Sequence, residues 1–150
     1  MLEYAWIEGS RAGAAFPALI FLHEGLGSIR QWRDFPAKVA QATGCRALVY
    51  DRYGYGNSDV LLEQRVGTEF MHDGALNELP EVLENLEIEN PILIGHSDGA
   101  SIALIHAGTY QVRGVAVMAP HVFIEDICVN SIRKSLEQFE TTDLPQRLGK

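Results

Sequence analysis

Residues 91–107 read PILIGHSDGASIALIHA, and this stretch decides the fold that the sequence predicts. Residues 91–94 have the length and apolar character of a short buried strand, and residues 100–107 have those of a buried helix. The turn between them, GHSDG at 95–99, is a G-x-S-x-G motif. Between a strand and a helix this motif lifts the serine hydroxyl clear of the sheet, where it can act as a nucleophile. We therefore expect Ser97 at a strained turn with positive φ, against the alternative of a plain surface turn before a helix.

Apolar runs alternate with helical patterns along the rest of the chain, which is typical of a mostly parallel sheet covered on both faces. Parallel, adjacent strands are expected near residues 18–22, 46–50, 91–95 and 112–118, with an early strand at 2–7. Helices are expected at residues 31–43 and 69–86. Pro80 should kink the second helix or begin another one, because proline lacks the N–H that a helix interior needs.

Composition narrows the class of protein. The 150 residues are 47% hydrophobic and 21% charged, as in an ordinary globular domain with a core. A net charge of -8 without a basic stripe argues against a nucleic-acid partner. No apolar run approaches membrane-spanning length, and the first residues lack a basic and apolar leader, so we expect no membrane partner and a cytoplasmic location. Cys45 and Cys128 form no C-x-x-C motif, which favours a core thiol at Cys45 over a disulfide or metal ligand.

Two glycine-rich loops raise the alternative of a dinucleotide site. The pairs at Gly25-x-Gly27 and Gly54-x-Gly56 both fall short of G-x-G-x-x-G, because Arg30 and Asp59 stand where the third glycine belongs. No histidine or cysteine cluster has the spacing of metal ligands. We therefore expect neither a cofactor nor a metal.

Three motifs in order resemble the α/β-hydrolase superfamily. HEGLG at 23–27 is similar to the His-Gly segment after the third strand of that fold, and DRYGYGNS at 51–58 is similar to its Asp-x-x-Gly-x-Gly-x-Ser loop. GHSDG at 95–99 looks like its nucleophile elbow. The resemblance implies an α/β fold with a mostly parallel sheet flanked by helices, here truncated before the last strands. Known members hydrolyse esters, amides, epoxides, carbon–halogen and carbon–carbon bonds, so the fold does not name the substrate.

The resemblance also implies roles for individual residues. Ser97 would attack a carbonyl carbon and form an acyl-enzyme. The backbone N–H of Asp98 would donate one hydrogen bond to the developing oxyanion. The second donor would be the Gly25 N–H, with the Leu26 N–H as the alternative. Glu24 stands where a glycine often follows the histidine, and this departure leaves the second donor open.

The acid and the histidine of the triad come after the elbow in this fold, and no run after Met118 resembles the strands that would bear them. Residues 1–121 are therefore interpreted as the N-terminal part of a hydrolase core, and residues 122–150 as the start of a helical cap or connecting segment. His121 alone leaves a strand at the catalytic end of the sheet. It is the candidate for a pocket residue or a general base.

These observations lead to one functional hypothesis and two alternatives. The hypothesis is a hydrolase that uses Ser97 on a small ester, amide or related carbonyl substrate, present as an incomplete domain and inactive alone because the triad acid and histidine are missing. One alternative is a non-catalytic binding module. The other is a half-domain that needs a partner chain, through self-association or a missing C-terminal half, at the sheet edge near residues 112–118.

Overall fold

The computed structural model describes residues 1–10, 16–60 and 67–148. The chain divides into two compact units, Met1–Pro120 and His121–Lys150, and each is described by itself.

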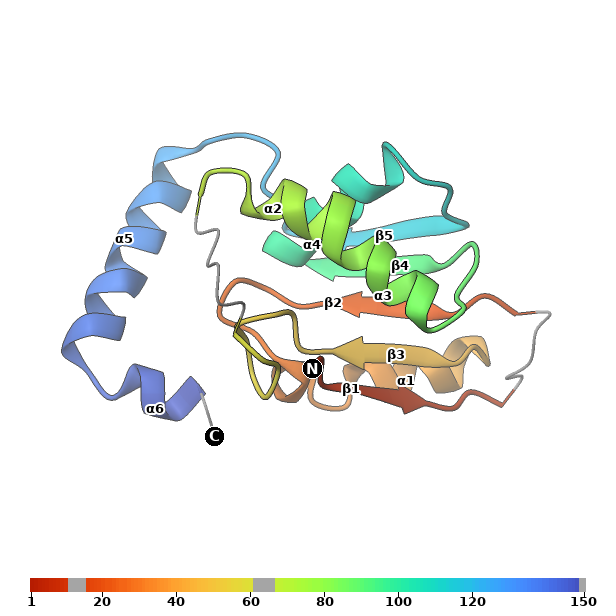
Figure 1. Cartoon of the computed structure of the whole chain (residues 1–150). Coiled ribbons are helices and arrows are strands. Elements are labelled where there is room, and N and C mark those ends of the chain that lie inside the picture. The colour runs from red at the N-terminus through yellow and green to blue at the C-terminus, as the bar shows by residue number, and fades with distance from the viewer. Residues whose placement is uncertain (11–15, 61–66, 149–150) are drawn as a thin grey trace. The chain divides into compact units, whose positions relative to one another are not determined.

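The first unit is built on a five-stranded sheet with the order β1-β3-β2-β4-β5 (Figure 1). The strands are β1 (Tyr4–Ile7), β2 (Leu19–Leu22), β3 (Ala47–Tyr50), β4 (Ile92–His96) and β5 (Gly114–Met118). Strands β3, β2, β4 and β5 are parallel and adjacent, as the sequence predicted, and the early strand β1 pairs antiparallel with β3 at one edge. Because these strands are parallel, the carboxyl ends of β2, β3, β4 and β5 lie at the same end of the sheet. The loops that follow the four strands therefore lie there too.

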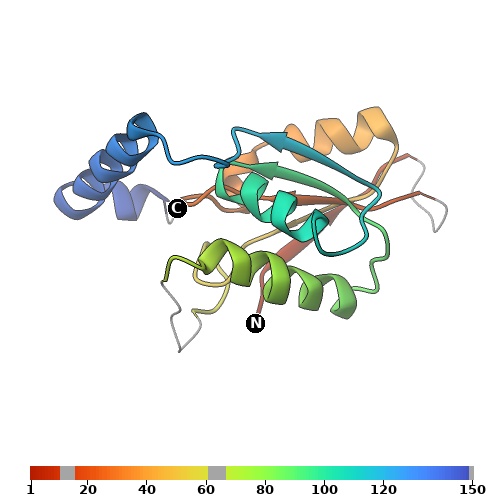
Figure 2. The same cartoon turned by 90° about the horizontal axis from the view of Figure 1, so that it is seen from above.

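Helices cover both faces of this sheet, which is why its central strands are buried throughout (Figure 2). Successive side chains of a strand point to opposite faces. One face of β2 and β3 therefore packs in a cluster with Ala40 of α1 (Phe35–Thr43). The other face packs in a second cluster with Ile102 and Ala103 of α4 (Asp98–Ala107) and with residues of α3.

The prediction of one continuous helix at residues 31–43 is wrong. A 3₁₀ helix, η1 (Ile29–Trp32), is followed by a break at Arg33, where φ is 52°, and α1 begins only at Phe35. Pro36 lies in the first turn of α1, where its missing N–H removes no helical hydrogen bond. The proline therefore fits the start of a helix and not the middle of one.

The helix expected at residues 69–86 forms in three pieces. They are α2 (Phe70–Asp73), the π-helical η2 (Gly74–Glu78) and α3 (Leu79–Asn85). Pro80 lies in the first turn of α3, where the hydrogen-bond pattern changes from π to α while the backbone stays helical through Glu78 and Leu79. Leu79 and Leu83 are buried against the sheet, as an apolar stripe at helical spacing requires.

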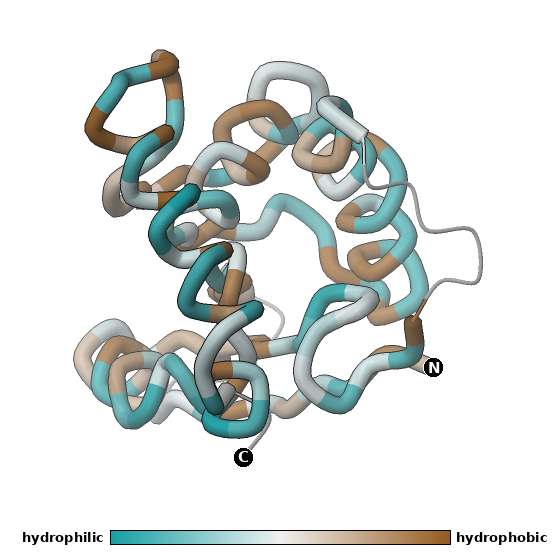
Figure 3. Tube along the Cα trace, turned by 90° about the vertical axis from the view of Figure 1, so that its left-hand side faces the viewer, coloured by the Kyte–Doolittle hydropathy of each residue, from teal (hydrophilic) through white to brown (hydrophobic). Residues whose placement is uncertain are grey.

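The second unit consists of α5 (Asp126–Thr141) and α6 (Leu144–Leu148). Hydrophobic and hydrophilic residues are interleaved along the helices of the chain (Figure 3), and in α5 none of the side chains is buried. None of the helices in the described part combines the length and the apolar character that a membrane span needs.

Candidate active site

Ser97 lies at a sharp turn between β4 and α4, with φ 53° and ψ -118°. This conformation is uncommon for a residue with a side chain, because its Cβ crowds the backbone. Backbone hydrogen bonds on both sides hold the turn. The Ser97 N–H donates to the Met118 carbonyl at 2.9 Å, and the Ser97 carbonyl accepts from the N–H groups of Ala100 at 3.0 Å and Ser101 at 3.1 Å. The strained strand-to-helix turn expected from the sequence is thus confirmed.

Two glycines allow α4 to start directly behind this turn. A Cβ on Gly95 would overlap the backbone of Gly99 and Ala100. A Cβ on Gly99 would overlap the carbonyl of Leu22 at the end of β2. Close backbone packing of α4 on β4 and β2 therefore requires glycine at both motif positions.

The loop after β2 lies against the first turn of α4. A Cβ on Gly25 would overlap the carboxylate of Asp98, the residue after the serine. Leu26 is 46% exposed. The structure thus brings Gly25 and Asp98 together beside the elbow. The N-terminus of α4 adds partial positive charge at this place.

His23 begins this loop and is fully buried. Its Nδ1 lies 2.7 Å from the Glu24 carbonyl, which can only accept, so Nδ1 carries the proton. Its Nε2 accepts a hydrogen bond from the Arg52 N–H at 3.1 Å. Burial, and then the charge of Arg52, lower the pKa of His23 to about 3. His23 is therefore neutral and joins two loops.

The Glu24 side chain makes a contact that sequence reasoning missed. Its Oε2 lies 3.3 Å from Nδ1 of His96, the residue before the serine, and both side chains are partly exposed. A Cβ on Gly27 would come within 2.9 Å of the Glu24 carboxylate. The signal in the sequence was a charged residue where the related pattern has glycine.

The loop after β3 is organised by Asp51, which is buried. Its Oδ1 accepts from the Ile29 N–H at 2.6 Å, and its Oδ2 accepts from the Asn57 N–H at 2.9 Å. Its carbonyl accepts from the Ser58 hydroxyl at 2.6 Å. Gly56 has φ 52°, and a Cβ there would overlap the Asp51 carboxylate. Asp51 therefore fixes the shape of two loops.

The other histidines of the described residues are His72, His106 and His121, and they belong neither to the elbow nor to the loop at 23–27. His106 is buried in α4, where its Nδ1 contacts the Ala75 carbonyl at 2.8 Å and burial lowers its pKa. His72 is exposed, 3.4 Å from the Glu69 carboxylate. His121 belongs to the second unit.

No group of three or more His, Cys, Asp or Glu within the described ranges could hold a metal ion. Cys45 is buried and Cys128 is partly exposed, and both are free thiols.

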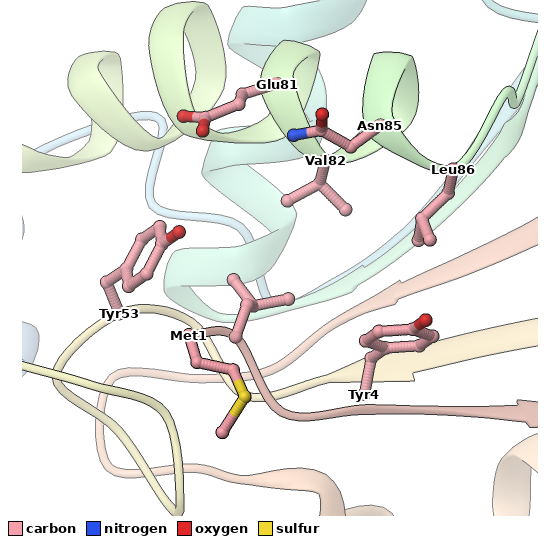
Figure 4. A pocket seen from close by; sticks show the side chains of 8 residues that line it. Met1, Tyr4, Tyr53, Glu81, Val82, Asn85 and Leu86 are labelled. Carbon is pink, nitrogen blue, oxygen red and sulfur yellow. The ribbon is translucent and has the colours of Figure 1, made fainter.

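A pocket of about 290 Å³ lies between β1 and α3 (Figure 4). None of its lining residues belongs to the elbow or to the loop at 23–27. They are Met1, Leu2, Tyr4, Tyr53, Glu81, Val82, Asn85 and Leu86. The pocket is therefore separate from Ser97.

Known proteins share the family and the fold of this chain. The sequence model of the family described as alpha/beta hydrolase fold matches residues 17–146. The chain belongs to this family. Among its relatives, a proline iminopeptidase from Lactobacillus delbrueckii subsp. lactis is 34% identical over 97 residues, which are 65% of this chain and 33% of the relative. Protein phosphatase methylesterase 1 from Mus musculus is 30% identical over 132 residues, 86% of this chain and 33% of the relative.

Solved structures show the same fold. A carboxylesterase from the thaumarchaeon Nitrososphaera gargenis matches with a TM-score of 0.72 at 20% identity, over 93% of this chain and 49% of that structure. A monoacylglycerol lipase from Paleococcus ferrophilus matches with a TM-score of 0.63 at 19% identity, over 89% of this chain and 50% of that structure. The chain thus spans about a third of the length of the curated relatives and half that of the structures.

Proposed function

We propose that this chain carries the nucleophile and the oxyanion hole of a serine hydrolase, with Ser97 as the nucleophile. The observation that supports this proposal most directly is the Ser97 backbone, held at φ 53° between β4 and α4. A strained backbone at a motif serine points to a function, because strain persists only where the surrounding structure enforces it.

The chemistry follows from the residues around this turn. Ser97 Oγ attacks the carbonyl carbon of the substrate and forms a tetrahedral intermediate, which expels its leaving group and leaves an acyl-enzyme. The backbone N–H groups of Asp98 and Gly25 stabilise the negative oxygen. The contact between Gly25 and the Asp98 side chain supports Gly25, rather than Leu26, as the second donor.

The proton of Ser97 needs an acceptor, and the histidines of the first unit have other roles. His23 and His106 contact backbone carbonyls. His96 lies beside the Glu24 carboxylate, and His72 lies beside the Glu69 carboxylate. The base in this proposal is therefore His121 or a histidine outside these 150 residues. We propose that the chain alone, without a complete triad, has little turnover.

The substrate class in this proposal is a small ester, amide or related carbonyl compound. Relatives named carboxylesterase, methylesterase and iminopeptidase support it, since these names cover ester and peptide bonds. The tetrahedral intermediates of ester and amide hydrolysis place an oxyanion in the same position, so one oxyanion hole serves both.

The test offers the chain a fluorophosphonate probe and p-nitrophenyl acetate, with Ser97→Ala and His121→Ala as matched variants. We expect slow labelling that Ser97→Ala abolishes, and turnover at the background rate in all three proteins. Loss of a whole triad lowers kcat by about a millionfold. The difference in turnover between a complete hydrolase and this chain is therefore measurable.

Two outcomes would change the proposal. Turnover that disappears in His121→Ala would make His121 the general base and the chain an active enzyme. An absence of Ser97-dependent labelling in a folded protein would contradict the nucleophile and favour the binding-module alternative.

We further propose that the chain associates with a second chain through β5. In the described residues β5 pairs only with β4, and Val115 on it is 36% exposed. An open sheet edge presents unpaired N–H and C=O groups to another strand. The partner is a second copy or a chain that supplies the rest of the fold.

A further inference from the structure

We propose that Arg52 is a positioning residue for the oxyanion hole, because its guanidinium holds the Glu24–Gly25 peptide with the Gly25 N–H directed at the elbow. This inference rests on the proposed function of Ser97. It adds a residue from the loop after β3 to a site otherwise formed by the loops after β2 and β4.

The Glu24 carbonyl accepts from three donors. His23 Nδ1–H lies at 2.7 Å, the Gly27 N–H at 3.0 Å and Arg52 Nη2 at 3.1 Å. One of these donors is local to the loop, one is the buried imidazole, and one is a cation from another loop. This carbonyl is therefore fixed in direction more firmly than an ordinary loop carbonyl.

Its direction determines that of the next N–H. In a planar trans peptide the C=O of one residue and the N–H of the next point to opposite sides. Because the Glu24 carbonyl faces His23, Gly27 and Arg52, the Gly25 N–H faces away from them. Gly25 also lies against the first residue of α4, Asp98. The orientation that Arg52 maintains is thus the one in which the Gly25 N–H can act as a donor beside Ser97.

Arg52 is buried near the Glu78 carboxyl: burial raises the pKa of Glu78, and the charge of Arg52 opposes this rise. Arg52 is 4% exposed, and its Nε has no hydrogen-bond partner in the described residues. Its guanidinium carbon lies 4.6 Å from the centre of the Tyr55 ring. Burial of a cation with an unsatisfied N–H is costly, and the hydrogen bond to the Glu24 carbonyl ties this buried charge to the peptide before Gly25.

His23 completes the arrangement. Its Nε2 accepts from the Arg52 N–H, which fixes the backbone from which the guanidinium extends. Because His23 stays neutral, Nε2 remains an acceptor while Nδ1–H donates to the same Glu24 carbonyl. The Tyr55 ring contacts both, with its centre 5.1 Å from that of His23.

The charge of Arg52 also acts on the donor strength of Gly25. A cationic donor on a carbonyl polarises the peptide, and hydrogen bonds in series strengthen one another. The Gly25 N–H should therefore be a better donor to an oxyanion than an unpolarised amide. A neutral residue of similar length at position 52 would lose this effect and one of the three anchors.

The test is NMR of the ¹⁵N-labelled chain, because the Gly25 amide nitrogen senses the hydrogen bonds of the preceding carbonyl. The variants are Arg52→Met and Arg52→Lys. The control is Arg46→Met, which removes the arginine directly before β3, whose guanidinium stacks on the Trp6 ring of β1. We expect an upfield shift of the Gly25 ¹⁵N resonance in R52M, partial recovery in R52K and no shift in R46M. The melting temperature of each variant separates this effect from a loss of stability.

An unshifted Gly25 resonance in folded R52M, or an equal shift in R46M, would overturn the proposal. If R52M does not fold, the test is a crystal structure of R52K. A Glu24 carbonyl that keeps its direction without a contact from the lysine would overturn the proposal. The Gly25 readout does not depend on the reactivity of Ser97. Failure of probe labelling would therefore contradict the proposed function and not the role of Arg52 in the peptide.

Discussion

At the scale of single residues, the backbone of Ser97 is the unfavourable feature of the site. A non-glycine residue at φ 53° and ψ -118° costs about 1–3 kcal/mol. The cost is tolerated because hydrogen bonds on both sides of the turn leave the backbone no alternative. The geometry of this turn sets the direction of the Ser97 side chain.

Replacement of Ser97 by glycine should therefore stabilise the protein. Glycine relieves about 1–3 kcal/mol of strain and loses about 0.4–1 kcal/mol through the entropy of the unfolded chain, for a net gain of about 1 kcal/mol. Ser97→Ala is the matched control, because it removes the hydroxyl and keeps the strain. Urea unfolding of the three proteins measures the difference. If the turn were not strained, S97G would be less stable than S97A by about 0.4–1 kcal/mol, and that outcome would contradict the prediction.

His23 should make the stability depend on pH. Its pKa in the folded protein is about 3, against 6.5 for an ordinary histidine, so between these values the unfolded chain binds a proton that the folded protein does not. Stability therefore falls as pH falls through this window, by about 1.4 kcal/mol per pH unit. Titration of the His23 ring by NMR, with urea unfolding at several pH values, checks this. A His23 ring that titrates near 6.5 would contradict it.

At the scale of elements, α4 is positioned by the absence of side chains at its start. Gly95 and Gly99 let its backbone approach β4 and β2, so that the site depends on two contacts between strand and helix backbones. Local sequence carries this information because only glycine fits such contacts.

Gly95→Ala should therefore destabilise the first unit by about 3 kcal/mol, since the added Cβ overlaps backbone that cannot move aside. Gly114→Ala on β5 is the control. The nearest atom to its Cβ would be Ile92 Cγ1 at 4.0 Å, an ordinary contact, so its effect should stay within about 0.5 kcal/mol. Thermal unfolding of both variants measures this, and similar losses in both would show that crowding at Gly95 is not the cause.

The difference between local signals and contacts between distant segments explains how far the sequence predicts the structure. Strands β2, β3 and β4 follow from continuous apolar runs, and the elbow follows from its glycines, because these signals are local. The break at Arg33 and the π-helical turn at residues 74–78 were not predicted, because apolar spacing cannot distinguish one helix from several. The contact between Glu24 and His96 joins two loops, and no single segment encodes it.

At the scale of the whole molecule, the two edges of the sheet differ in strand direction. At the β1 edge the strand is antiparallel and short. At the β5 edge, Val115 and Ala116 are exposed on a parallel strand, and such an edge favours pairing with another chain. The chain also covers only about half of the structures that share its fold. The β5 edge and the partial coverage together motivate the association proposed above.

This association should be visible in solution and should respond to a charge on β5. We expect analytical ultracentrifugation of the wild type to show a sedimentation coefficient that rises with concentration. Ala116→Lys places a charge on the exposed strand, and edge lysines oppose strand pairing, so this variant should sediment as a monomer. Thr109→Lys, at an exposed position after α4, is the control and should associate like the wild type. A wild type that is monomeric at every concentration, or equal weakening by both lysines, would mean that β5 is not the interface.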